Sequence, residues 1–429
     1  MRASAARRPG RPAGRRRPDP HNPLEYNILL TATLCLLAYG AVMVYSASSA
    51  RTLLQGQGDG SAYLVKYVTY GVAGFMLMHL VARRGLEKAL RFTGPLLGFA
   101  LVCLLAVKIP GVGVEINGAR RWLGAGPLQF QPSEVAKLAL VLYAAKILAQ
   151  KPGRLRHPRQ ITPLLVVAAV AVLLVASQPD LGTALVLTFT TAALLVAAGM
   201  PVRYLLIGAA AGSVLVLLYA LTAGYRRERL MTFLDPWAHA GDEGFQAVQG
   251  QIALGSGGLF GRGLGQSVQK IFYLPEAHTD FILAIIGEEL GVAGILGLIF
   301  LYGLFGYAGL SVAKKAKGAY ASLLAAGITS MVLCQASLNL FAILGLAPLT
   351  GVPLPFISYG STNLVVLLIG MGLLLNIARG GTVHLREVKT PRRRDAQASV
   401  RHGADVPHRS GRHGGARRPR AGGRRRAAG

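Results

Sequence analysis

The hydrophobic residues of this chain fall into long runs that are nearly free of charge. Several runs last about 20 residues, which is the length that an α-helix needs to cross the hydrocarbon core of a bilayer. A membrane β-barrel would show short stretches of alternating polarity instead. The pattern therefore predicts an all-α polytopic membrane protein of about ten transmembrane helices, at residues 27–46, 62–82, 92–109, 134–149, 161–177, 183–199, 203–222, 281–310, 319–346 and 361–378.

Two parts of this pattern are irregular. The run 134–149 is the weakest of the ten because Glu134, Lys137 and Lys146 interrupt it. The runs on either side of Asp180 are short, which suggests re-entrant or broken helices. Membranes tolerate such segments only where the backbone faces protein or water.

Composition adds a division into three parts. Of the 429 residues 52% are hydrophobic and 15% are charged, whereas about a quarter of a soluble protein is charged. The net charge of +28 is concentrated in the ends, and both ends are rich in Arg, Gly, Pro and Ala. We expect disordered basic tails at 1–24 and 381–429 around a membrane domain at 25–380. The tails serve either topology and solubility or docking onto anionic lipid or an acidic partner.

The loops between the predicted helices alternate in charge. Lys and Arg gather in loops that share one side of the membrane with both tails, at 83–91, 151–159, 203 and 314–317. The positive-inside rule places this side, and both termini, in the cytoplasm. The remaining loops face outward, at 47–61, 110–133, 178–182, 223–280 and 347–360, and the largest of them, 223–280, lies between helices seven and eight.

Five arginines break this charge rule. Arg120 and Arg121 lie in the outward loop 110–133, and Arg226, Arg227 and Arg229 lie in the large outward loop. Cations on the outer side, against the general bias, indicate an anionic substrate such as a phosphate or pyrophosphate.

The first candidate motif is GARRWLGAGPLQFQPSEVAKL, residues 118–138. Its Pro-Ser-Glu sequence predicts a helix start with Ser133 as the N-cap. In one interpretation Trp122 anchors the chain at the membrane interface and Lys137 extends its ammonium to the headgroups. In the other, Lys137 and the two arginines bind phosphate, and Trp122 stacks on a sugar or a prenyl chain.

The second motif is SQPDLGTAL, residues 177–185, in which a proline and a glycine break the backbone between two apolar runs. Asp180 lies at the outer membrane boundary. It either caps the next helix or pairs with Arg121 or Lys137, and a role in fixing this loop competes with a role in substrate binding.

The third motif is LPEAHTDFILAIIGEELG, residues 274–291. Glu276 and Asp280 are four residues apart and would share a face if the segment were helical. Asp280 lies at the expected entry of the eighth span, where the helix dipole favours an ionised carboxylate, and this would suit a general base. Glu288 and Glu289 lie two turns deeper. Buried pairing with Lys137 or a loop arginine is favoured for them over catalysis, although an ionisable residue inside a membrane suggests function.

The fourth motif is GLAPLTGVPLPFISYGSTNL, residues 345–364, whose prolines exclude a continuous helix. It either forms a tight outer loop that re-enters and caps the last span, or it lines a cavity with hydroxyl groups such as those of Ser358 and Ser361. A separate glycine-rich stretch, GSGGLFGRGLGQS, lacks the GxxxxGK[ST] pattern of a nucleotide-binding loop, so we do not expect a nucleotide.

Together the four motifs resemble the SEDS family of bacterial membrane glycosyltransferases, which comprises the FtsW, RodA and SpoVE proteins. The resemblance covers about residues 27–380, and the third motif is more like the division branch of the family than the elongation branch. It implies a bundle of ten helices with a large outer loop between helices seven and eight. Asp280, Trp122 and Lys137 match functional positions of the family, whereas Gln129 stands where some division members carry an arginine.

The resemblance implies a peptidoglycan glycosyltransferase that joins lipid II disaccharides into glycan strands at the outer leaflet during septal wall synthesis. Asp280 would be the catalytic base, and a divalent cation, Mg²⁺ or Mn²⁺, is a candidate at the pyrophosphate. The expected substrate-binding residues are Arg121, Trp122, Glu134, Lys137, Asp180, Glu276, His278, Ser358 and Ser361.

The expected partners are lipid II, a class B penicillin-binding protein that acts as transpeptidase, and other division proteins that the basic tails would contact. No nucleic acid is expected. The expected location is the plasma membrane at the division septum, with several membrane passes and both termini in the cytoplasm. Alternatives are an elongation polymerase of the same chemistry, a lipid II flippase or transporter, and a non-enzymatic scaffold.

Overall fold

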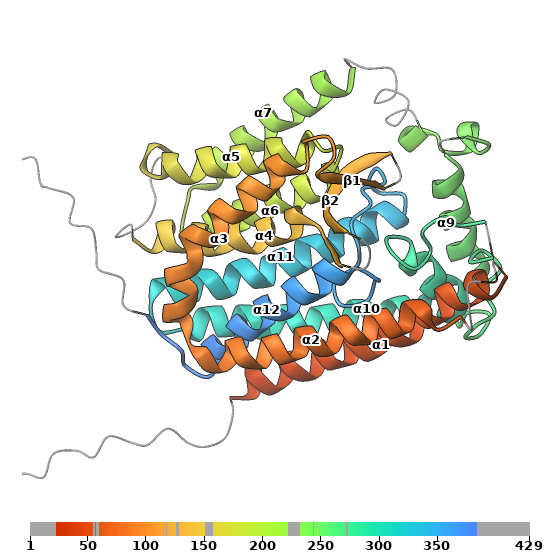
Figure 1. Ribbon diagram of the computed structural model, residues 1–429, viewed down its shortest axis with the longest axis horizontal. Helices are drawn as coiled ribbons and strands as arrows, with labels where there is room; N and C mark the ends of the chain where they lie inside the picture. Colours follow the sequence, from red (N-terminus) through yellow and green to blue (C-terminus); the bar gives the residue numbers. More distant parts are fainter. Residues whose placement is uncertain are drawn as a thin grey trace, which may run out of the picture. The chain divides into compact units, whose positions relative to one another are not determined.

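The computed structural model is built almost entirely of α-helices (Figure 1). The structure describes residues 23–383 apart from residues 55, 57–59, 117, 126–127, 151–157, 222–231, 243 and 272. The expectations for Arg226, Arg227 and Arg229, and for nearly all of both tails, lie outside the described residues. The helices are α1 (Leu24–Leu54), α2 (Ala62–Arg84), α3 (Leu86–Ala106), α4 (Pro132–Ala149), α5 (Thr162–Ala176), α6 (Leu181–Ala197), α7 (Val202–Leu221), α9 (Phe245–Gly257), α10 (Ile282–Lys315), α11 (Ala319–Ile343) and α12 (Ser361–Ala378), with short 3₁₀ turns at Pro158–Ile161 and Trp237–His239.

Each of the ten predicted spans overlaps one of these helices, and α9 lies in the large outer loop. Within the described residues, seven helices are long and apolar enough to cross a membrane: α1, α2, α3, α5 with the 3₁₀ turn before it, α10, α11 and α12. Helix α6 and the described part of α7 are apolar but shorter, and α4 carries the three charged residues noted above. The prediction of an all-α polytopic membrane protein is confirmed.

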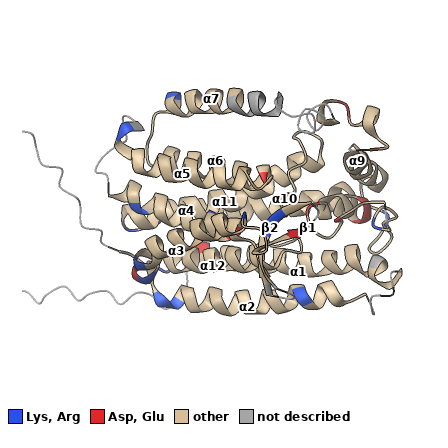
Figure 2. Cartoon of the chain, turned by 45° about the horizontal axis from the view of Figure 1, so that its top comes forward, with Lys and Arg blue, Asp and Glu red and all other residues tan. Residues whose placement is uncertain are grey.

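The helices differ in how much of their surface other helices cover. In the most apolar 18-residue stretch of α11, and likewise of α12, 67% of the residues are buried. In α2 the corresponding share is 17%. Helices α2 and α3 expose apolar side chains such as Met76 and Phe92, as expected for a face that meets lipid. Figure 2 shows Lys and Arg gathered at the end of the bundle where α2 meets α3, with few charges along the helices. The central helices are therefore the ones that can hold buried polar groups.

The segment between α3 and α4 contains a small sheet, where the sequence predicted only a loop. Strands β1 (Gly113–Ile116), β2 (Ala119–Ala125) and β3 (Leu128–Phe130) pair antiparallel in the order β1-β2-β3. Leu123 of β2 packs against Cys103 and Val107 at the end of α3. The sheet thereby fixes β2, which carries two arginines and a tryptophan of the first motif, at the end of the bundle where α3 ends.

The helices that flank Asp180 are continuous, so the predicted re-entrant or broken helix is wrong at this position. Helix α5 ends at Ala176 and α6 begins at Leu181, and four residues join them in a tight turn. Helix α5 is short because a 3₁₀ turn forms the first part of its segment. Helix α6 is short in itself.

The broken helix is α10 instead. Gly291 has φ 66, and the backbone on its two sides belongs to two helical pieces. The glycine-rich stretch enters this break: the amides of Arg262 and Gly263 donate to the carbonyls of Glu288 (3.0 Å) and Glu289 (2.9 Å). A methyl group on Gly261 would lie 2.1 Å from the Glu289 carbonyl oxygen, so only glycine permits this approach. The stretch is structural, and it makes 282–290 a separate short helix.

Candidate active site

The loop between α11 and α12 lies at the centre of the four motifs. Its residues 352–358 are buried or half-buried, and its carbonyls accept hydrogen bonds from the surrounding helices. The hydroxyl of Tyr302 on α10 donates to the Pro355 carbonyl (2.5 Å), and that of Tyr67 on α2 donates to the Phe356 carbonyl (2.5 Å). The loop thus re-enters the bundle before α12 begins, as one of the two interpretations predicted.

Two amides on α11 join this loop to the start of α10. Gln335 Nε2 donates to the Pro353 carbonyl (2.8 Å). Asn339 Nδ2 donates to the carbonyls of Val352 (2.8 Å) and Asp280 (2.7 Å). The sequence reasoning missed both amides. The available signal was their spacing of four residues in an apolar run, which puts two groups that need partners on one helix face.

Asp280 lies two residues before α10 begins at Ile282, as predicted. The condition for a helical face shared with Glu276 is not met, because residues 275–281 form turns and Glu276 has a left-handed backbone with φ 56. Thr279 bridges the two acids instead. Its hydroxyl lies 3.3 Å from Glu276 Oε2 and 3.0 Å from Asp280 Oδ1.

The surroundings of Asp280 favour its neutral form. Its pKa is raised to about 6, chiefly by burial and to a smaller extent by the charge of Glu276. The hydrogen bond from Thr279 and those from the backbone at Asp280 and Phe281 act in the opposite direction. The residue is nevertheless half-exposed. A carboxyl with this pKa is mostly ionised at neutral pH and is a stronger base than an ordinary aspartate, which suits proton abstraction.

His278 is buried among aromatic rings. Its ring centroid lies 4.3 Å from that of Tyr63 on α2 and 5.7 Å from that of Tyr359, which lies in the proline-rich loop between α11 and α12. The amide of Tyr359 donates to the His278 carbonyl (3.0 Å). His278 therefore links three segments close to Asp280.

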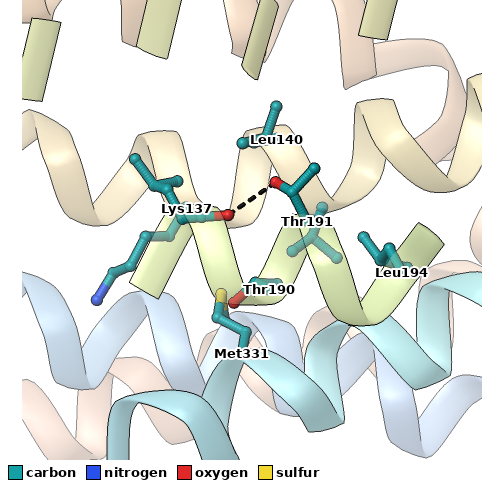
Figure 3. A pocket seen from close by; sticks show the side chains of 8 residues that line it. Lys137, Leu140, Thr190, Thr191, Leu194 and Met331 are labelled. Atoms are coloured by element: carbon teal, nitrogen blue, oxygen red, sulfur yellow. Dashed lines mark hydrogen bonds between the residues drawn. The ribbon is translucent and has the colours of Figure 1, made fainter. Parts of the chain in front are cut away.

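Lys137 is buried, with 1% of its surface exposed, so its ammonium does not extend to the headgroups in this structure. Its Nζ lies 2.8 Å from Glu134 Oε2 and 2.7 Å from Gln335 Oε1. Figure 3 shows its stem beside a narrow interior gap that Thr190 and Met331 also line, and its ammonium points away from that gap. Glu134 and Lys137 thus form a buried ion pair that joins α4 to the amides of α11.

Asp180 is the N-cap of α6, as one of its two interpretations predicted, because its Oδ1 accepts from the Thr183 amide (3.1 Å). Its Oδ2 accepts from Gln131 Nε2 (3.3 Å) and Ser133 Oγ (3.5 Å). The predicted N-cap role of Ser133 is wrong, since α4 begins at Pro132 and its N-cap is Gln131. Ser133 is already helical, and its hydroxyl turns to Asp180.

The two arginines of the first motif have different partners. Arg121 is half-buried and donates to the carbonyls of Gln178 (Nε to O, 3.0 Å) and Pro179, so it holds the turn that contains Asp180. Arg120 is exposed and pairs with Glu115 on the neighbouring strand (3.1 Å). Trp122 is half-buried on β2 opposite Val114.

The two candidate serines are placed differently. Ser358 is buried, and its Oγ accepts from the Leu354 amide (2.8 Å), which fixes the turn of the proline-rich loop. Ser361 is half-buried at the first position of α12. Next to it, Thr362 accepts a hydrogen bond from the Gln131 amide (3.1 Å), which joins α12 to the start of α4.

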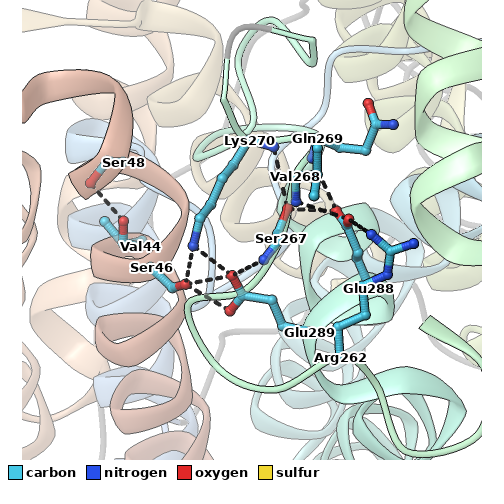
Figure 4. A network of polar contacts seen from close by, with 10 residues as sticks. All are labelled: Val44, Ser46, Ser48, Arg262, Ser267, Val268, Gln269, Lys270, Glu288 and Glu289. Atoms are coloured by element: carbon cyan, nitrogen blue, oxygen red, sulfur yellow. Dashed lines mark hydrogen bonds and ion pairs between the residues drawn. The ribbon is translucent and has the colours of Figure 1, made fainter. Parts of the chain in front are cut away.

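Glu289 is fully buried in an ion pair, as predicted, but its partner is Lys270 (Nζ to Oε1, 2.8 Å) and not Lys137. The Ser46 hydroxyl on α1 also reaches its carboxylate, at 2.7 Å. Figure 4 shows the Lys270 ammonium pointing between Glu289 and Ser46. The pair therefore ties the loop between α7 and α10 to α1 and α10.

Glu288 is also buried and pairs with a loop arginine, as predicted. Arg262 Nη1 lies 3.5 Å from its Oε1. The carboxylate also accepts from the Ser267 hydroxyl (2.5 Å) and from the amides of Val268 (3.0 Å) and Gln269 (3.3 Å). Both carboxylates are thus saturated with donors and serve to hold the loop.

Within the described residues, no group of three or more His, Cys, Asp or Glu side chains is placed to hold a metal ion. Glu276 and Asp280 are two carboxylates joined through Thr279. We therefore assign no step to a metal ion.

Comparisons with known proteins agree with this arrangement. The family model described as "Cell cycle protein", for the FtsW, RodA and SpoVE proteins, matches residues 27–382. The chain is 37% identical over 352 residues to the probable peptidoglycan glycosyltransferase FtsW of Geobacter sulfurreducens, which covers 82% of this chain and 94% of that protein. It is 37% identical over 354 residues to stage V sporulation protein E of Bacillus subtilis, covering 82% of this chain and 96% of that protein.

A solved structure is similar over the same region. It comes from work on the "structural coordination of polymerization and crosslinking by a peptidoglycan synthase complex". One of its chains matches this chain with a TM-score of 0.69 and 31% sequence identity. The match covers 83% of this chain and 98% of that chain. The chain therefore belongs to the FtsW, RodA and SpoVE family of membrane-embedded cell cycle proteins.

Proposed function

We propose that this chain is a peptidoglycan glycosyltransferase that polymerises lipid II at the outer leaflet during septal cell-wall synthesis. The names of its relatives support the reaction class and the division role. The observation that carries the proposal is Asp280: a half-exposed carboxyl of raised pKa at the start of a helix, where all four motifs converge on one loop.

Asp280 acts as the general base. The hydroxyl oxygen of the acceptor sugar forms a bond to the anomeric carbon of the donor, and its proton passes to the Asp280 carboxylate. The bond from the anomeric carbon to the lipid pyrophosphate breaks, and the pyrophosphate leaves with the electron pair. Such base catalysis contributes roughly 10²–10⁴ in rate. Attack opposite the departing group inverts the anomeric centre, by analogy with inverting glycosidases.

Charge for the leaving pyrophosphate comes from the outer arginines in this proposal. Arg121 is the stronger candidate, because its bonds to two carbonyls orient a guanidinium that is half-exposed. A fixed cation near developing negative charge stabilises the transition state. Lys137 would contact phosphate only after it leaves Glu134 and Gln335, so we assign it to the electrostatics and rigidity of the site. Trp122 is the candidate for stacking on a sugar or prenyl chain.

The expected partners and orientation belong to the same proposal. A relative of known structure is part of a peptidoglycan synthase complex that coordinates polymerization with crosslinking. This supports a transpeptidase partner, a class B penicillin-binding protein, for this chain. The gathering of basic residues at one end of the bundle supports cytoplasmic termini.

The test is polymerisation of lipid II by the purified chain, with the products separated by length. Wild-type protein should lengthen glycan, and Asp280→Asn should abolish lengthening. Asp242→Asn, which neutralises an exposed acid in the outer loop, is the matched control and should stay active. Transfer of lipid across vesicles without any lengthening would favour the flippase alternative and contradict the proposal.

A further inference from the structure

One oxygen of the Asp280 carboxylate faces a glycine, Gly351, which has no side chain to fill the space between them. Thr279 donates to Oδ1 (3.0 Å), and Oδ2 faces Gly351 of the proline-rich loop. A methyl group built on Gly351 would lie 3.7 Å from Oδ2. Among the described residues, no other atom beyond the chain neighbours lies within 4 Å of that position. Gly351 is exposed and Asp280 is half-buried, so the carboxylate lies at the boundary between the interior and the surface.

The spacing between Gly351 and Asp280 is fixed by a single side chain. Asn339 Nδ2 donates at once to the carbonyl of Asp280 and to that of Val352, the residue after Gly351. On the other side, a methyl group on Gly182 of α6 would lie 2.4 Å from the Thr350 carbonyl oxygen, so α6 packs directly against the loop. The peptide that carries Gly351 is therefore held from both sides and cannot drift from the carboxylate.

We propose that Gly351 is the floor of the acceptor subsite: the acceptor sugar enters across its bare Cα and places its hydroxyl against Asp280 Oδ2, while Asn339 is the positioning residue that sets the gap. The inference rests on the proposed function. A hydroxyl that donates to a carboxylate approaches to about 2.5–2.7 Å, and the sugar carbon behind it then lies in the volume that a Cβ at residue 351 would fill. Glycine is the residue that lets a ligand come this close to the backbone.

The step balances without a further reactant. The hydroxyl proton moves to Oδ2 as the glycosidic bond forms, and the lipid pyrophosphate leaves as an anion. Asp280 returns the proton to solvent through its exposed side. Gly351 needs no charged or polar group for this role, because its lack of a side chain leaves room for the acceptor sugar.

A competing explanation is that Gly351 is glycine only because its φ is +65. Gly380 supplies the matched control: its φ is +88, it follows α12, and a methyl group on it would meet no atom of the described residues within 4 Å. Both positions have a positive φ, so Gly351→Ala and Gly380→Ala should each lower the melting temperature through left-handed strain. Only the first places a methyl group in the acceptor's path.

The experiment measures single-turnover polymerisation of lipid II and the melting temperature for both variants. We expect Gly351→Ala to lose about 100-fold or more in rate, the size of effect that a misplacement of 1 Å produces, while Gly380→Ala stays near wild type. Gly351→Asn tests strain separately, since asparagine adopts left-handed backbone readily, and it should also be inactive. If Gly351→Ala or Gly351→Asn were as active as Gly380→Ala, the proposal that Gly351 lines the acceptor subsite would be wrong.

Asn339 is tested by its isosteric variant Asn339→Asp, which cannot donate to either carbonyl when ionised. Asn376 is the control: it is buried in α12 and donates to the Ala82 carbonyl (2.7 Å). A positioning role predicts that Asn339→Asp lowers kcat at least tenfold at unchanged KM, whereas Asn376→Asp lowers the melting temperature alone. Equal, purely thermal effects of both variants would overturn the positioning role.

Failure of the subsite and failure of the proposed function are distinguishable. If Asp280→Asn is inactive and Gly351→Ala is active, the base stands and the acceptor path across Gly351 is wrong. If Asp280→Asn is active, the proposed base itself is wrong.

Discussion

The third motif contains two carboxylate sites that lie two helical turns apart and behave in opposite ways. Glu288 and Glu289 are buried, and each has a cation and several hydrogen-bond donors. Asp280 is half-buried and accepts hydrogen bonds from the Thr279 hydroxyl and from the backbone, but within the described residues it has no salt bridge. A buried charge that is paired with a cation holds structure, whereas a partly buried carboxyl without a cation is available for chemistry.

The largest expected effect is on the rate of polymerisation, and it distinguishes Asp280 from the paired carboxylates Glu288 and Glu289. Asp280→Asn removes the base and should lower the rate of polymerisation about 10²–10⁴-fold, with little change in thermal stability. The measurement is the single-turnover rate per folded molecule, with folded protein quantified by size-exclusion chromatography. A rate within tenfold of wild type would mean that the two sites do not differ as described.

The next effect concerns stability. Lys270→Met keeps the length of the side chain but leaves Glu289 as a buried charge without its cation, which should cost about 3–5 kcal/mol. The measurement is denaturant or thermal unfolding in lipid nanodiscs. The protein that remains folded should keep a near-normal dependence of rate on pH, because Asp280 is unchanged. An unaltered unfolding transition would show that the pair is dispensable.

A smaller effect sharpens the chemistry of Asp280. Thr279→Val removes a hydrogen bond that favours the ionised carboxylate, so the pKa of Asp280 should rise above about 6. Because the base works only when ionised, the acid limb of the rate profile should move to higher pH. Thr183→Val, which keeps the amide that caps α6, is the control and should leave the limb in place. Identical profiles for wild type and Thr279→Val would contradict the assignment.

The smallest expected effect is on stability, and it distinguishes the Arg262–Glu288 ion pair from the Lys270–Glu289 ion pair. Arg262 is 44% exposed and lies 3.5 Å from Glu288, which also has three other donors. Arg262→Ala should therefore cost about 1 kcal/mol or less, far below the cost of Lys270→Met. Unfolding measured side by side under one condition checks the order, and a larger loss for Arg262→Ala would reverse it.

The sequence was sufficient for the helices and for part of the site. Hydropathy located ten helices, of which seven within the described residues are long and apolar enough to cross a membrane, because about 20 apolar residues mark a span in any context. It also placed Asp280 at the start of a helix and paired Glu288 and Glu289 inside the protein. Their partners, Arg262 and Lys270, could not be predicted because they come from a loop whose path depends on tertiary packing.

The failures have related causes. Lys137 was expected to reach either headgroups or phosphate, because hydropathy places a helix in the membrane without saying which face meets another helix. The break in α10 was missed since Gly291 does not disturb the apolar pattern. The short strands of the outer sheet pair only across a few residues, so their signal was weak. Gln335 and Asn339 carried a signal in their spacing, but their roles depend on carbonyls that the sequence does not place.

The most direct measurement leaves the protein unaltered: the single-turnover rate of lipid II polymerisation by the wild-type chain between pH 5 and pH 8. The pKa of Asp280 is about 6, and the base is inactive when protonated. The account predicts a rate that is constant above about pH 7, half-maximal near pH 6 and roughly tenfold lower for each further unit of acidification. A rate independent of pH across this range would contradict the assignment of Asp280 as the base.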